Sequence, residues 1–155
     1  MKLGASAAKV VSPESVETGR WVAWKCQFGC GCFGSSLVCP PHSPTPQQTR
    51  RILDEYKQAV LFECPDGKTK RVAALMERDL FLAGCYRAFG LGSGPCELCE
   101  VCAFDKGCRH PHQARPAMEA CGIDVFATAR RNGFKVEVVR GTRDEQHYFG
   151  LVLVR

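Results

Sequence analysis

Cysteine is the residue type with which this chain could do the most chemistry, because eleven of its 155 residues are cysteine. A disulfide scaffold is typical of an exported chain with an even cysteine count. Here the count is odd, and Lys9 interrupts the short apolar N-terminal stretch, which makes a poor signal peptide. We therefore expect reduced thiols in a cytoplasmic protein, where thiolates bind metal ions or iron–sulfur clusters.

The most regular spacing belongs to the second cysteine group, which we define as Cys96, Cys99, Cys102 and Cys108. The first two gaps are two residues each, as in bacterial ferredoxin clusters, but the last gap is five residues instead of three. A straight helix would separate Cys96 and Cys102 by about 9 Å along its axis, so a loop is expected, with backbone N–H groups directed at the sulfurs. The spacing predicts a [4Fe–4S] cluster; structural zinc and a loop without metal are the alternatives.

Four cysteines nearer the N-terminus are separated by gaps of three, one and six residues: Cys26, Cys30, Cys32 and Cys39. A radical-SAM loop would need its third cysteine at Phe33, so that assignment fails. Cysteines separated by one residue rarely bind one cluster without strain, so Cys30 and Cys32 are not expected to act together. We define the first cysteine group as Cys26, Cys30, Cys39 and Cys121, and expect a second cluster or metal site there. Whether Cys32 replaces Cys30 or Cys121 stays open.

A basic patch follows the second cysteine group and contains Arg109, His110, His112 and Arg115. One interpretation is charge balance, because an oxidised four-thiolate cubane carries two negative charges that nearby cations stabilise. The other is a site at which Arg109 and Arg115 hold an anionic cofactor or an acidic partner. His42 and His112 are expected to form loop hydrogen bonds, and Glu77 and Glu97 to be helix-face or loop charges without an acid–base role.

The composition is that of one ordinary domain with a net charge of +5. No apolar run approaches the roughly 20 residues that span a bilayer, and basic and aromatic residues do not interleave as on a nucleic-acid-binding surface. Because the 45% hydrophobic fraction includes the cysteines, the remaining core is lean, and a metal bound only in the folded state would add stability. Cys64 and Cys85 are expected to be small buried hydrophobes, and Trp21 and Trp24 to lie in the core.

The helices and strands expected from the sequence predict an α+β fold. It would have a small, mostly antiparallel sheet with helices on one face and two cysteine-rich metal-binding loops. Residues 1–19 are expected to be weakly structured, with an edge strand at 9–11, and residues 20–155 to form a single cysteine-rich metal-binding domain. A capping box at Thr45 and Gln48 predicts the start of the first long helix. Asp124 is expected to cap the helix at 124–131. The expected strands are 21–25, 59–64, 134–140 and 147–154, the last two as a hairpin, and the expected helices are 46–57, 69–89, 116–122 and 124–131.

Several stretches of the chain resemble the domain-of-unknown-function-2284 family of predicted metal-binding proteins. They are residues 25–30, 39–46, 49–51, 94–99, 108–111, 114–125 and 148–153. The resemblance runs from about residue 20 to the end, and it implies iron–sulfur or other metal binding. It also implies that all eight members of the two cysteine groups recur in the family, whereas Cys32 and Cys85 are departures from its pattern.

Two classes of function follow. The first is a small cytoplasmic iron–sulfur module with one or two [4Fe–4S] clusters that carries electrons to a partner protein in an anaerobe's enzyme system. The second is a cluster-dependent redox enzyme in which one iron keeps an open position for substrate. A zinc-stabilised interaction domain is a third alternative. No catalytic residue is identified, no nucleic-acid or membrane partner is expected, and the oligomeric state stays open.

Overall fold

Four strands form one antiparallel sheet in the order β1-β2-β4-β3. A computed structural model describes residues 3–155 of the chain. The strands are β1 (Ala7–Val11), β2 (Ala59–Glu63), β3 (Phe89–Leu91) and β4 (Phe149–Leu153). The helices are α1 (Arg20–Gly29), α2 (Pro46–Asp54), α3 (Thr69–Leu82) and α4 (Val125–Arg131), with short 3₁₀ turns η1 (Pro13–Ser15) and η2 (Glu119–Cys121). The α+β class is thereby confirmed.

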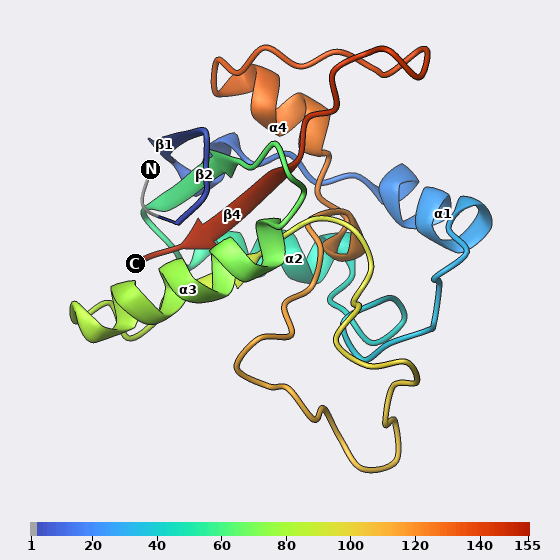
Figure 1. Cartoon of the computed structure of the whole chain (residues 1–155). Coiled ribbons are helices and arrows are strands. Elements are labelled where there is room, and N and C mark those ends of the chain that lie inside the picture. The colour runs from blue at the N-terminus through green and yellow to red at the C-terminus, as the bar shows by residue number, and fades with distance from the viewer. Residues whose placement is uncertain (1–2) are drawn as a thin grey trace.

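The sheet is covered on both faces, so the expectation of helices on one face is wrong. Leu61 and Leu151 pack on one face with residues of α2 and α4, whereas Phe62 and Val152 pack on the other face with residues of α3. In Figure 1, α3 runs below the strands and α4 lies above them. The physical reason is that the central strands β2 and β4 are apolar on both sides, and both sides must be shielded from water.

Two helices begin as their capping residues predict. The Thr45 hydroxyl accepts a hydrogen bond from the backbone of Gln48, whose side chain accepts one from the backbone of Thr45, so the predicted capping box opens α2. Asp124 caps α4 by accepting from the backbone of Ala127. The expected helix over 69–89 is too long, because α3 ends at Leu82. Beyond this end, Tyr86 and Phe89 are exposed.

Residues 21–25, expected as a strand, belong to α1. A short apolar and aromatic run does not distinguish a strand from a helix. Only Val22 of this helix is buried, whereas Trp21 and Trp24 are 49% and 68% exposed. The expectation that these tryptophans lie in the core is therefore wrong as well.

The expected C-terminal hairpin is also absent from the described structure. Residues 134–140 form no strand, although Phe134 and Val136 are buried in the core. β4 pairs with β2 along one edge and with β3 along the other. Because both edges of β4 are already hydrogen-bonded, no edge is left for the 134–140 segment.

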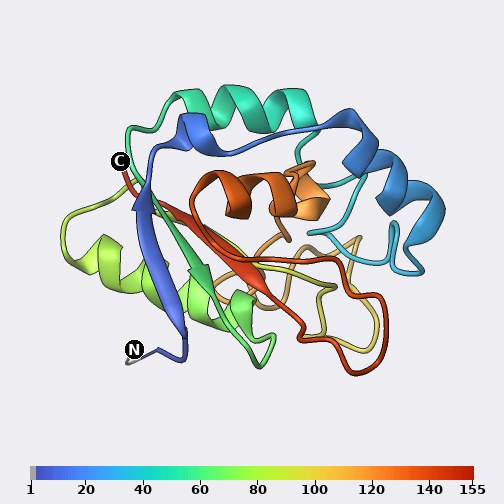
Figure 2. The same ribbon diagram turned by 90° about the horizontal axis from the view of Figure 1, so that it is seen from above.

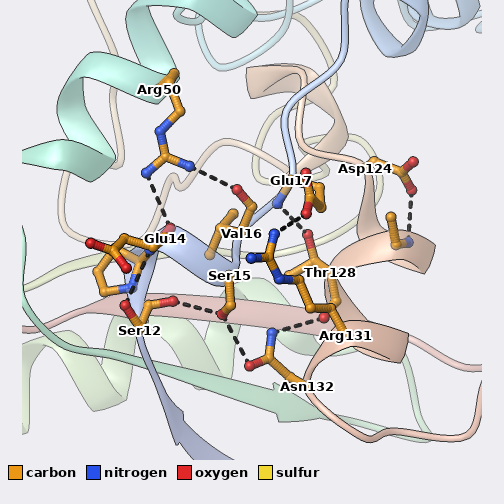
Figure 3. Close-up of polar contacts among 12 residues, drawn as sticks. Ser12, Glu14, Ser15, Val16, Glu17, Arg50, Asp124, Thr128, Arg131 and Asn132 are labelled. Atoms are coloured by element: carbon orange, nitrogen blue, oxygen red, sulfur yellow. Dashed lines mark hydrogen bonds and ion pairs between the residues drawn. The ribbon is translucent and has the colours of Figure 1, made fainter.

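Residues 1–19 are expected to be weakly structured, but their described part contains β1 and η1. Ala7–Val11 pairs with β2 along its whole length, at the edge of the sheet as expected for 9–11. The following residues run between α2 and α4, as Figure 3 shows. Arg50 of α2 donates to the carbonyl oxygen of Val16 at 2.8 Å, and the backbone of Glu17 donates to Thr128 of α4 at 3.0 Å. This segment therefore holds two helices on the same face.

The cysteine-bearing loops gather at one end of the molecule. In Figure 2, α1 and the loops that follow it lie at the opposite end from the two termini, and Figure 1 agrees. Among residues 3–155, none of the helices has the length and apolar composition of a membrane-spanning segment.

Candidate metal centre

The second cysteine loop, residues 93–115, is a long irregular excursion that is closed at its base. The N–H of Gly92 donates to Pro116 at 3.0 Å, and the N–H of Met118 donates back to Gly92 at 2.8 Å. Between these points the described chain forms no helix or strand, and Figure 1 shows the loop extending away from the sheet. The segment is therefore irregular and does not follow a straight helix. Loops of such length without secondary structure are usually functional or mobile.

Arg115 ties the end of this loop to α3. Its guanidinium pairs with both carboxylate oxygens of Glu77 and donates to the carbonyl oxygens of Pro111 and Ala114. Arg115 is 8% exposed, whereas Arg109 is exposed on the loop. Arg115, expected to hold a cofactor or partner, is thus engaged within the protein itself. Glu77, expected to be a helix-face or loop charge, is its partner.

The members of the first cysteine group come from three parts of the chain. Cys26 lies in the last turn of α1, and Cys30 caps the end of that helix. Cys39 is buried in the following loop, and Cys121 is buried on η2. Burial raises the pKa of Cys26, and the negative charges of Cys30, Glu119 and Cys39 raise it further. These groups are therefore electrostatic neighbours.

Side chains from the first cysteine loop, residues 26–44, and from α2 hold Cys121 in place. Ser43 donates to the carbonyl oxygen of Ala120 at 2.6 Å, and Thr49 donates to that of Cys121 at 2.7 Å. The next residue, Gly122, has a φ of 73°, and a Cβ there would lie 2.3 Å from Pro46 Cγ. Only glycine allows η2 to approach the start of α2 this closely. Burial raises the pKa of Cys121 to about 12.

The two cysteine loops touch each other. The N–H of Leu37 in the first loop donates to Cys102 Sγ of the second loop at 3.4 Å. The rings of His42 and Phe104 make a second contact, with centroids 5.2 Å apart. Within the second loop, the N–H of His110 donates to Cys108 Sγ at 3.4 Å. The two cysteine loops are therefore in contact.

Sequence reasoning missed two charged residues in this region. Lys70 Nζ and Glu119 Oε2 are buried without a hydrogen-bond partner in the described structure, as is Ser36 Oγ in the first loop. Burial lowers the pKa of Lys70, against the opposing charges of Cys96, Cys39, Glu119 and Glu97. A lysine in the first turn of a helix, and a glutamate within an otherwise apolar turn, were the available signals.

A cavity of about 700 Å³ opens beside the first loop. Four cysteines line it: Cys26, Cys30, Cys32 and Cys39. Most of the remaining wall is apolar and includes Trp21, Phe33 and Phe126. This volume lies in the range of small-molecule sites.

Comparison with known families identifies the chain. The family described as "Predicted metal-binding protein (DUF2284)" matches residues 9–154. The chain belongs to this family. The predicted resemblance is therefore confirmed at the level of the family and of metal binding. Neither a curated protein nor a solved structure gives a significant match.

The cysteine side chains of this DUF2284 member are the type of donor that binds a metal through thiolates. Cysteine donors prefer zinc, copper(I) and iron–sulfur clusters, and orphaned buried polar atoms lie beside both cysteine groups. In residues 3–155, however, no group of three or more potential ligand side chains is already arranged to hold a metal ion. The sulfurs would have to converge when the metal binds, which is common because metal binding and local folding are coupled.

Of the three cysteines outside the groups, Cys32 lines the cavity, whereas Cys64 and Cys85 lie elsewhere and differ in burial. Cys64 is fully buried, and its thiol donates to Asp66 at 3.1 Å. Burial and the hydrogen bond with Asp66 raise its pKa to about 11. Cys85, expected in an apolar helix, lies instead in the turn after α3 and is only partly buried. Its expected burial is therefore not observed.

Proposed function

We propose that this protein holds two [4Fe–4S] clusters, one on each cysteine group, and serves as a small cytoplasmic redox module that passes electrons to a partner protein in an anaerobe. The main support is that the two cysteine loops meet, through the hydrogen bond from the N–H of Leu37 to Cys102 Sγ. Eight cysteines from distant stretches of the chain contribute to a single region. Metal binding is the family property, and the cluster type and electron transfer are our proposal.

Two hydrogen bonds to sulfur suit thiolates that bind a cluster. The N–H groups of Leu37 and His110 donate to Cys102 Sγ and Cys108 Sγ. Such bonds delocalise negative charge from the sulfurs and raise the reduction potential of a cluster. The ferredoxin-like gaps of the second group point the same way.

A second candidate function is a redox enzyme with an open iron position at the first cysteine group. The cavity of about 700 Å³ beside Cys26, Cys30, Cys32 and Cys39 favours it. If only three of these thiols bind a cluster, the fourth iron faces the cavity and is free to bind a substrate. The apolar wall would suit a substrate with a largely apolar body.

Analysis of protein purified without oxygen tests the proposal. Two [4Fe–4S] clusters give about eight iron and eight sulfide ions per chain, a brown colour, and an electron paramagnetic resonance signal after reduction. About four of each would leave only one cluster. Colourless protein with stoichiometric zinc would contradict the redox function and show that the metal has a structural role. A change of that signal on adding cyanide, a ligand for an open iron position, would favour the enzyme over the carrier.

A further inference from the structure

Lys70 is held at the base of the second cysteine loop by close packing. It is the second residue of α3, and its backbone and side chain lie against Gly92. A Cβ at Gly92 would be 2.5 Å from Lys70 Cγ and 2.7 Å from Lys70 N. The preceding residue, Thr69, accepts a hydrogen bond from the backbone of Ser93 at 2.8 Å. The position of the lysine stem is therefore determined by its neighbours.

The ammonium at the end of this stem is close enough to cysteines of both groups, and to two glutamates, to interact with them electrostatically. Its electrostatic neighbours are Cys96, Cys39, Glu119 and Glu97. Cys96 belongs to the second group and Cys39 to the first, and Glu119 is also a neighbour of Cys26 and Cys121. Yet Lys70 Nζ is buried without a hydrogen-bond partner in the described structure.

This arrangement is costly in a metal-free protein. A positive charge in the first turn of a helix opposes the helix dipole. Burial of an ammonium without a hydrogen-bonding partner adds a desolvation penalty. A fixed negative charge at the cysteine groups would offset both costs. A metal ion or cubane held by four thiolates supplies that charge, since zinc with four thiolates and an oxidised cubane each carry two net negative charges.

We infer that Lys70 is an internal counter-ion shared by the metal–thiolate centres of both cysteine groups. This inference rests on the proposed metal binding at the two groups. It does not depend on whether the bound species is a cluster or a single metal ion, because both are anionic when held by four thiolates.

Lys70→Met should have opposite effects on the metal-bound and the metal-free forms of the full chain. We expect Lys70→Met to weaken metal binding at both groups by about 10- to 100-fold, the usual effect of losing a residue that supports metal ligands. In chelator-treated protein, the same substitution should raise the thermal midpoint, because it removes the unpaired buried ammonium. A residue with a merely structural role would lower the midpoint in both states.

The measurement is a titration with Co²⁺, followed by thiolate-to-cobalt absorbance in competition with a chelator. Cys121→Ala and Cys99→Ala backgrounds isolate the second and the first group respectively. Lys68→Met is the matched control, because Lys68 lies two residues before Lys70, is exposed and pairs with Asp66. This substitution should change neither the metal affinity nor the thermal midpoint. Lys70→Arg keeps the charge and should retain most of the affinity.

Three results would overturn the inference: unchanged affinity in Lys70→Met, a loss confined to one group, or a loss accompanied by a lower midpoint of the chelator-treated protein. A wild-type chain that binds Co²⁺ at both groups but assembles no iron–sulfur cluster would contradict the proposed redox function alone. A wild-type chain that binds no metal would overturn both proposals.

Discussion

Arg115 and Glu77 form a two-pronged ion pair in which Nε and Nη2 of the arginine each lie 2.6 Å from one carboxylate oxygen. The two side chains are only 10% and 17% exposed. The same carboxylate accepts the N–H of Gly90 in β3 at 2.7 Å. Glu77 therefore holds both the strand that leads into the second cysteine loop and the residue at which that loop ends.

We expect Glu77→Gln to lower the free energy of unfolding by about 3 kcal/mol, because it leaves the Arg115 guanidinium buried without a charged partner. Urea denaturation measures this change. Glu137→Gln is the matched control: Glu137 is 87% exposed and lies 4.0 Å from Arg130, so its loss should cost at most about 0.5 kcal/mol. Equal effects of the two substitutions would show that the Arg115–Glu77 pair is not a structural clamp.

The two cysteine groups should lose metal independently. We expect Cys121→Ala to remove about half of the bound iron or zinc and Cys99→Ala to remove the other half, because each residue supplies a ligand to one group only. Metal analysis of purified protein measures the loss. Cys85→Ala, in the turn after α3, should leave the content unchanged. Full metal content in Cys121→Ala together with a loss in Cys32→Ala would assign Cys32 to the first group instead.

Gly122 should be less tolerant of a side chain than a loop glycine with similar backbone geometry. Gly122 and Gly107 have φ values of 73° and 78°, but a Cβ at Gly107 meets nothing within 4 Å, whereas one at Gly122 collides with Pro46. We expect Gly107→Ala to cost about 1–2 kcal/mol of backbone strain, and Gly122→Ala about 1–3 kcal/mol more. Thermal unfolding of both variants tests this, and equal costs would contradict the close packing of η2 on α2.

The reduced, metal-free protein should lose stability as the pH rises above 9. The pKa of Cys64 is raised to about 11 and that of Cys121 to about 12, from an ordinary value of 9.0. Between pH 9 and 12 the folded state therefore binds more protons than the unfolded state, and the free energy of unfolding falls. The stabilisation is fully present below pH 9.

Urea denaturation across this pH range measures the effect. Cys64→Ala and Cys121→Ala should each make the fall shallower than in the wild type, because each removes one thiol that stays protonated only in the folded state. If the slopes of both variants match that of the wild type, the burial of these thiols does not control alkaline stability.

Local signals determined much of the fold from the sequence alone. The capping box at Thr45 and the aspartate cap at Asp124 correctly mark the starts of α2 and α4, because a cap is a contact between near neighbours in the chain. The apolar run that forms β2 was likewise evident. The spacing of the cysteines predicted a metal-binding protein, and the description of the DUF2284 family as predicted metal-binding proteins agrees with it.

Tertiary structure decided what depends on distant partners. Residues 21–25 have the composition of a strand but lie in α1, and residues 134–140 alternate like a strand but find both edges of β4 occupied. The burial of Lys70 Nζ and Glu119 Oε2 without a hydrogen-bond partner among the described residues depends on segments far apart in sequence, and so does the Arg115–Glu77 pair. Residue types and their spacing establish which atoms can bind a metal, whereas the packing of helices and loops establishes which charges surround those atoms.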